Sequence, residues 1–136
     1  MKIRIALGLL ATIALHALLS QFAPALLPGA GSSIGVATLV QSSALQSAII
    51  SFIAVAVGAF VARCRFLLPA IFLWLATWLV VIYTLTGISA GQSSYWEIAR
   101  FNWLAISASL LSTIIGAKLG EFLGAKSGRA GSAAAT

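Results

Sequence analysis

Acidic side chains are nearly absent from this sequence. Its 136 residues contain no aspartate and two glutamates, Glu97 and Glu121, beside eight lysines and arginines and one histidine. Catalysis needs groups that attack, transfer protons or stabilise charge. This inventory excludes a single-chain Ser-His-Asp triad and a paired-aspartate site, and it argues against a metal-hydrolysis centre. We therefore expect no catalytic residues and a protein that is not an enzyme.

Cysteine is equally scarce. The single residue Cys64 excludes an intramolecular disulfide and any cysteine-rich metal cage. A phosphate-binding glycine loop is also missing, because the glycines near the C-terminus are spaced by four within a predicted helix and follow no strand. We predict no metal site and no cofactor, apart from one alternative for His16 given below.

Charge of either sign is rare. Charged residues make up 7% of the chain and hydrophobic residues 61%, whereas an average soluble domain has about 25% charged residues. A chain this apolar belongs in a membrane, with lipids as its surroundings. The net charge of +6 would suggest nucleic acid for a soluble protein. Here the basic residues flank apolar runs, which is typical of membrane proteins and excludes nucleic acid as the expected partner.

Long apolar runs are what the sequence does contain. A membrane-spanning helix needs about 20 apolar residues, and the runs are continuous, unlike the short alternating segments of a membrane barrel. The prediction is an all-α integral membrane protein with four transmembrane helices in an antiparallel bundle. A single domain covers 1–126 and a flexible tail covers 127–136. The predicted helices are, approximately, 4–22, 42–63, 66–86 and 98–123.

The basic residues predict the orientation of the bundle. Seven of the eight fall on one side of the four-helix arrangement and Arg100 alone falls on the other. Because cytoplasmic loops carry the excess of Lys and Arg, we expect both termini in the cytosol and the protein in the bacterial inner (cytoplasmic) membrane. The seven residues are Lys2, Arg4, Arg63, Arg65, Lys118, Lys126 and Arg129.

Small residues recur at every fourth position of the last helix. Small-xxx-small rows let helix backbones approach closely in membranes. We predict that the first four members pack against a partner helix, and that Gly124 and Gly128 mark the helix leaving the bilayer. The four packing residues are Ala108, Ser112, Gly116 and Gly120.

Each glutamate has a basic residue three positions away. Glu97 precedes Arg100, and Lys118 precedes Glu121. Residues three apart are neighbours on a helix surface, and an acid in the first turn suits the helix dipole. We therefore expect a capping and local ion-pair role for Glu97 at the start of the last helix. At its other end we expect a second ion pair, with Glu121 reaching the headgroup region.

A polar face lies at the start of the second helix. Ser43, Ser47 and Ser51 form a stripe at helical spacing, with Gln46 beside it. Two interpretations are open. The face lines a polar pathway for a small solute, or its side chains form hydrogen bonds between helices, which contribute about 0.6 kcal/mol each.

His16 lies about two-thirds of the way across the first helix. Ionisable groups inside a membrane are functional candidates, so His16 is a candidate ligand or proton site. Trp74 and Trp78, four residues apart on the third helix, offer a surface on which a pigment or haem would rest beside His16. The simpler alternative is a neutral imidazole that hydrogen-bonds a neighbouring Ser or Gln.

These patterns predict a small non-catalytic inner-membrane protein that acts as an accessory, anchoring or assembly subunit of a larger membrane complex. It would dock through its small-residue faces, onto other membrane subunits or onto a second copy. The first alternative is a homo-oligomeric channel or transporter for a small polar solute, which uses the polar face of the second helix. The second alternative is a pigment- or haem-binding membrane subunit that uses His16.

Overall fold

Long helices dominate the part of the chain that the structure describes. The computed structural model describes residues 2–22, 36–89 and 92–133, with side chains from 44 onward in the second range and up to 127 in the third. No strand occurs in these ranges, so the all-helical prediction is confirmed. The helices are α1 (Lys2–Phe22), α2 (Val36–Ala62), α3 (Leu67–Ile88), α4 (Tyr95–Phe101) and α5 (Trp103–Ala133).

Four of these helices are long and apolar enough to cross a membrane. The candidate spans are Lys2–Phe22, Ala44–Ala62, Leu67–Ile88 and Trp103–Ser127. Two helices exceed the predicted bounds: α2 begins at Val36 rather than near 42, and α5 continues to Ala133 rather than ending near 123. The fold is therefore compatible with a multi-pass membrane protein, as the hydropathy predicts.

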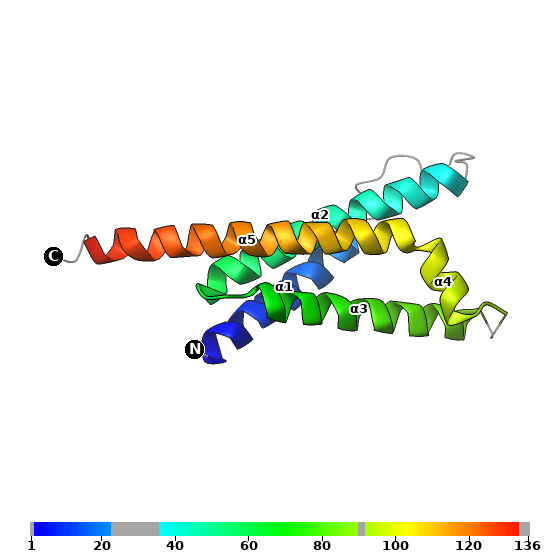
Figure 1. The fold of residues 1–136 in the computed structure, drawn as a ribbon, viewed down its shortest axis with the longest axis horizontal. Helices are drawn as coiled ribbons and strands as arrows, with labels where there is room; N and C mark the ends of the chain where they lie inside the picture. The colour runs from blue at the N-terminus through cyan, green and yellow to red at the C-terminus, as the bar shows by residue number, and fades with distance from the viewer. Residues whose placement is uncertain (1, 23–35, 90–91, 134–136) are drawn as a thin grey trace.

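Consecutive long helices run antiparallel, so that α2 and α5 lie parallel, and the helices share two distinct ends. Figure 1 shows the N-terminus and the turn between α2 and α3 at one end, with α5 extending past them toward the C-terminus. The short helix α4 lies at the opposite end. Since Arg63 and Arg65 lie in the α2–α3 turn, we refer to that end as the basic end and to the other as the α4 end.

The predicted last helix is divided at Asn102. Its side-chain Nδ2 donates to the carbonyl oxygen of Ile98 at 2.9 Å, and its backbone N–H donates to the same oxygen at 3.1 Å. Asn102 is the C-cap residue of α4, and α5 starts at Trp103 in a different direction (Figure 1). Tyr95 and Trp96 of α4 are exposed, and such aromatic residues are typical of a membrane–water interface.

A capping box starts α4. The hydroxyl of Ser94 accepts from the backbone N–H of Glu97 at 3.3 Å, and the Glu97 carboxylate accepts from the backbone N–H of Ser94 at 2.8 Å. This reciprocal arrangement satisfies two donors that a helix start leaves unpaired. These hydrogen bonds from Ser94 hold the pKa of Glu97 below its ordinary value. The capping role expected for Glu97 is thus confirmed, and its described partner is Ser94.

Helix α2 lies at the centre of the bundle and packs against α5 on one face. The glycines of α5 permit this contact: a Cβ placed on Gly116 would lie 2.7 Å from the carbonyl oxygen of Phe52, and one on Gly120 would lie 2.7 Å from the Cβ of Ala59. Real Cβ atoms do not approach so closely. The two backbones therefore come together only because these positions have no side chain.

Another face of α2 packs against α1 through a second glycine contact. A Cβ on Gly8 would lie 2.7 Å from the carbonyl oxygen of Gly58 and 2.8 Å from the Cβ of Ala62. Thr12, one helical turn further along α1, is 2% exposed, and its hydroxyl donates to the carbonyl oxygen of Gly8 at 2.9 Å. Small residues on two faces of α2 thus hold the three helices together.

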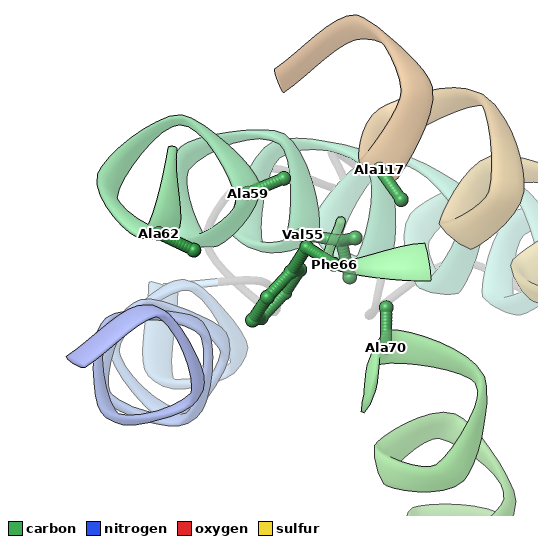
Figure 2. Packing of buried hydrophobic residues seen from close by; sticks show 6 residues of the cluster. All are labelled: Val55, Ala59, Ala62, Phe66, Ala70 and Ala117. Atoms are coloured by element: carbon green, nitrogen blue, oxygen red, sulfur yellow. The ribbon is translucent and has the colours of Figure 1, made fainter. Parts of the chain in front are cut away.

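One large side chain fills the space that these small residues leave near the basic end. Phe66 is fully buried, and alanines surround it (Figure 2). The ring points from the α2–α3 turn toward α1, where a Cβ on Gly8 would lie 2.9 Å from Cε2 of Phe66. We call this group the Phe66 cluster; its members are Val55, Ala59, Ala62, Phe66, Ala70 and Ala117.

Candidate functional site

A cavity of about 430 Å³ lies between α1, α2, α3 and α5. Its volume falls within the range of about 300–1,000 Å³ that is usual for small-molecule sites. The walls are mainly apolar, and a limited set of polar side chains reaches them from each of the four long helices. Besides the two tryptophans of α3, the polar residues of the lining are Thr12, His16, Ser47, Ser51, Thr77, Asn102, Ser109 and Thr113.

The cavity extends from the Phe66 cluster toward the α4 end. Val55 and Ala70 line the cavity and also belong to the Phe66 cluster, so this cluster forms the floor of the cavity. Ser47, Val81 and Asn102 lie at the other extreme of the lining, as the antiparallel directions of their helices require. The cavity is therefore closed toward the basic end by tightly packed side chains.

Two tryptophans of α3 are tied to one serine of α5. The indole Nε1 atoms of Trp74 and Trp78 each donate to the Oγ of Ser109 at 3.0 Å, and this hydroxyl donates to the carbonyl oxygen of Ile106 at 3.0 Å. Ser109 is 1% exposed. Every hydrogen-bonding position around this hydroxyl is occupied, and these bonds hold both indoles in place. Because their N–H groups are used, the indoles contribute ring surface to the cavity.

The structure gathers predicted residues that the sequence analysis had assigned to separate hypotheses. His16 of α1, Ser47 and Ser51 of α2, and the tryptophan pair of α3 line the same cavity. Gln46 is half-buried and does not line it. The side chain of Ser43 lies outside the described residues.

The predicted small-residue row contacts α2 of the same chain. Gly116 and Gly120 are buried there, while Ala108 and Ser112 are half-buried. The contact reaches one turn beyond the predicted end, because a Cβ on Gly124 would lie 3.1 Å from the carbonyl oxygen of Phe60. Gly116, Gly120 and Gly124 are thus covered by α2 of the same chain.

Sequence reasoning missed a neighbouring row on α5. Ala105, Ser109 and Thr113 line the cavity at spacings of four, and Ala117 follows them into the Phe66 cluster. On α1, Thr12 stands four residues before His16 and shares its face. The spacing of small and hydroxyl residues by four could have identified this row in the sequence. The glycines at the same spacing on the same helix were the more obvious pattern.

The carboxylate of Glu121 caps α3 from a distant part of the chain. Its Oε1 accepts from the backbone N–H of Phe66 at 2.6 Å and from that of Leu67 at 3.0 Å. The N-cap residue Phe66 has no capping side chain of its own, so Glu121 satisfies donors that would otherwise be unpaired. The other oxygen lies 3.9 Å from Nζ of Lys118, the ion pair that the spacing predicts.

Together these features define an all-helical bundle compatible with a multi-pass membrane protein, with a partly open cavity between its four long helices. No protein-family model matches this chain, and neither a curated protein nor a solved structure is significantly similar to it. Within the described ranges, no group of three His, Cys, Asp or Glu side chains is arranged to hold a metal ion.

Proposed function

We propose that this protein is a non-catalytic transporter of the bacterial inner membrane that binds a small polar solute in the cavity between α1, α2, α3 and α5. The observation that carries this proposal is the convergence of polar side chains from four helices on one apolar-walled cavity. Polar groups inside a membrane are costly unless they serve packing or function. The sequence suggested an accessory subunit, a channel or transporter, and a pigment- or haem-binding subunit. Of these three, a transporter gives a role to the largest number of the polar residues that line the cavity.

The closed floor favours a carrier over an open pore. The Phe66 cluster separates the cavity from the basic end, so a solute crosses only if helices move. Helices α1 and α3 make few contacts with each other, and a relative movement of these two helices would disturb little packing. The positive-inside rule favours a cytosolic basic end, with both termini in the cytosol.

An accessory or anchoring role is the second candidate. Only 6% of the α3 span is buried within the chain, so α3 offers surface to another membrane subunit or a second copy. The glycine row of α5 is not available for docking onto another subunit, because α2 of the same chain covers it. Lipid alone also accounts for the exposed face of α3, and for this reason the carrier is the primary proposal.

The carrier proposal is tested by solute entry into proteoliposomes. Purified protein is reconstituted, and swelling is followed by light scattering after mixing with urea, glycerol or nicotinamide. We expect faster entry of at least one solute than in protein-free vesicles. Ser47→Leu, which fills the cavity with an apolar side chain, should reduce the protein-dependent rate by roughly tenfold, corresponding to about 1.4 kcal/mol.

Ser107→Leu is the matched control, because Ser107 is exposed on α5 away from the cavity. It should leave the rate unchanged. Equal rates with and without protein for all three solutes would contradict transport. A stoichiometric foreign membrane protein that co-purifies in mild detergent would then favour the accessory role.

A further inference from the structure

We infer that the cavity selects an uncharged solute with a planar ring, which rests against Trp74 and Trp78 and hydrogen-bonds to His16 and the cavity hydroxyls. This inference rests on the proposed function and names the substrate class of the same site. Three features of the lining support it: its lack of charge, the hydrogen bonds of its indole groups, and the direction of the Thr77 hydroxyl.

The lining carries no fixed charge. Among its residues, all within the described part of the chain, there is no Lys, Arg, Asp or Glu, and His16 is the one titratable group. An ion that entered would lose its hydration without meeting a counter-charge, which is strongly unfavourable. A neutral solute avoids this cost.

The tryptophans favour a ring over a hydrogen-bonding group at their position. Their N–H groups are both donated to Ser109, so the indoles contribute ring surface to the cavity. Flat rings stack favourably on such surfaces. A cation would also be attracted to an indole face. That attraction is smaller than the cost of desolvating an ion in a cavity that contains no carboxylate.

The hydroxyl of Thr77 favours a solute that donates hydrogen bonds. Thr77 lines the cavity, and its hydroxyl donates its proton to the carbonyl oxygen of Leu73 at 2.8 Å. A hydroxyl whose proton is committed in this way still accepts. An amide or hydroxyl on the solute therefore finds an acceptor at Thr77. The hydroxyl of Thr12, by contrast, packs against Gly58 in the α1–α2 contact.

Isothermal titration calorimetry of the purified full-length protein in detergent tests this inference with three probes of one skeleton. Nicotinamide is neutral, nicotinate is an anion, and 1-methylnicotinamide is a fixed cation at neutral pH. We expect nicotinamide to bind, and both charged probes to bind at least roughly tenfold more weakly. The neutral probe also carries amide N–H groups that the Thr77 hydroxyl can accept.

Variants locate the binding. His16→Leu should weaken nicotinamide binding by roughly tenfold, and Trp74→Phe should weaken it less, because phenylalanine keeps a ring. Trp96→Phe is the matched control: Trp96 is 75% exposed on α4 and outside the cavity, and its replacement should change nothing. A variant is compared only after its size-exclusion profile and thermal unfolding match those of the wild type.

Two results would overturn the inference. In the first, nicotinate or 1-methylnicotinamide binds as tightly as nicotinamide, and His16→Leu weakens this binding. The cavity then still binds solutes, and the carrier proposal stands. The second is absence of nicotinamide binding, or binding that His16→Leu leaves unchanged. Failure of the proposed function itself is distinguishable, since it appears as absence of protein-dependent solute entry.

Discussion

Glu121 connects the start of α3 to α5 through a carboxylate that lies 55 residues from Phe66 along the chain. The spacing to Lys118 correctly points to a local ion pair, yet Lys118 is 63% exposed, and its nitrogen is 3.9 Å away. Exposed pairs of this kind contribute about 0–1 kcal/mol. The shorter hydrogen bonds to Phe66 and Leu67 are the stronger interaction, because hydrogen bonds to charged groups contribute about 1.5–3 kcal/mol.

Removal of this cap should destabilise the bundle. We expect Glu121→Ala to lower the free energy of unfolding by about 2–3 kcal/mol, because it leaves the N–H groups of Phe66 and Leu67 without their acceptor. The measurement is unfolding in mixed micelles with increasing SDS. Lys118→Ala is the control and should change stability by less than about 1 kcal/mol. If both variants lowered the free energy of unfolding equally, the stabilisation would come from the ion pair with Lys118 and not from the cap on α3.

At the scale of helices, α2 owes its central place to small residues on two faces. The α5 face receives Gly116, Gly120 and Gly124, and the α1 face meets Gly8. Membrane helices associate through such close backbone contact, because lipid gives them no hydrophobic reason to pair. Helix α3 has no comparable glycine contact in the described structure; Gly87, near its C-terminal end, has nothing within 4 Å of an added Cβ.

Two glycine-to-alanine substitutions separate packing from helix propensity. In Gly120→Ala the new Cβ would overlap the carbonyl oxygen of Ala56, and we expect a loss of about 1–3 kcal/mol, as for an overpacked core. Gly87→Ala adds the same methyl group in open space and should be neutral or stabilising by up to about 1 kcal/mol. SDS unfolding of both variants measures the difference. Identical stabilities would contradict a tight α2–α5 contact.

At the scale of the whole molecule, the two ends of the bundle differ in charge. The turn that carries Arg63 and Arg65 lies at the basic end, and α4 lies at the other (Figure 1). If the basic end is cytosolic, as the positive-inside rule predicts, the cavity extends from its closed floor toward the outer side of the membrane.

Cysteine labelling tests this orientation. In a Cys64→Ser background, single cysteines are introduced at the exposed positions Ser127 and Gln92, which lie on α5 beyond the basic end and before α4, respectively. We expect a membrane-impermeant maleimide to label Ser127→Cys in inverted vesicles and Gln92→Cys in right-side-out vesicles. The Cys64→Ser parent is the unlabelled control. The reverse pattern would place the basic end outside.

Local features were predictable from the sequence because they depend on residues close together in the chain. Hydropathy over about 20 residues is enough to recognise four apolar helices, and spacing by four was enough to recognise the glycine row of α5, though not the neighbouring row through Ser109. The start of α2 and the division at Asn102 were not recognised. The start of α2 depends on how far an apolar helix continues beyond the part that can cross a membrane. The division at Asn102 depends on a side chain that hydrogen-bonds back to the carbonyl oxygen of Ile98.

Only the tertiary structure decided which surfaces meet. It joins the glycine row to α2 of the same chain, directs Glu121 to the start of α3, and gathers His16, Ser47 and Trp74 around one cavity. A helical row is recognisable from its own residues, but its partner depends on how whole helices fit against one another. That fit joins positions far apart in the chain, and no local pattern in the sequence encodes it.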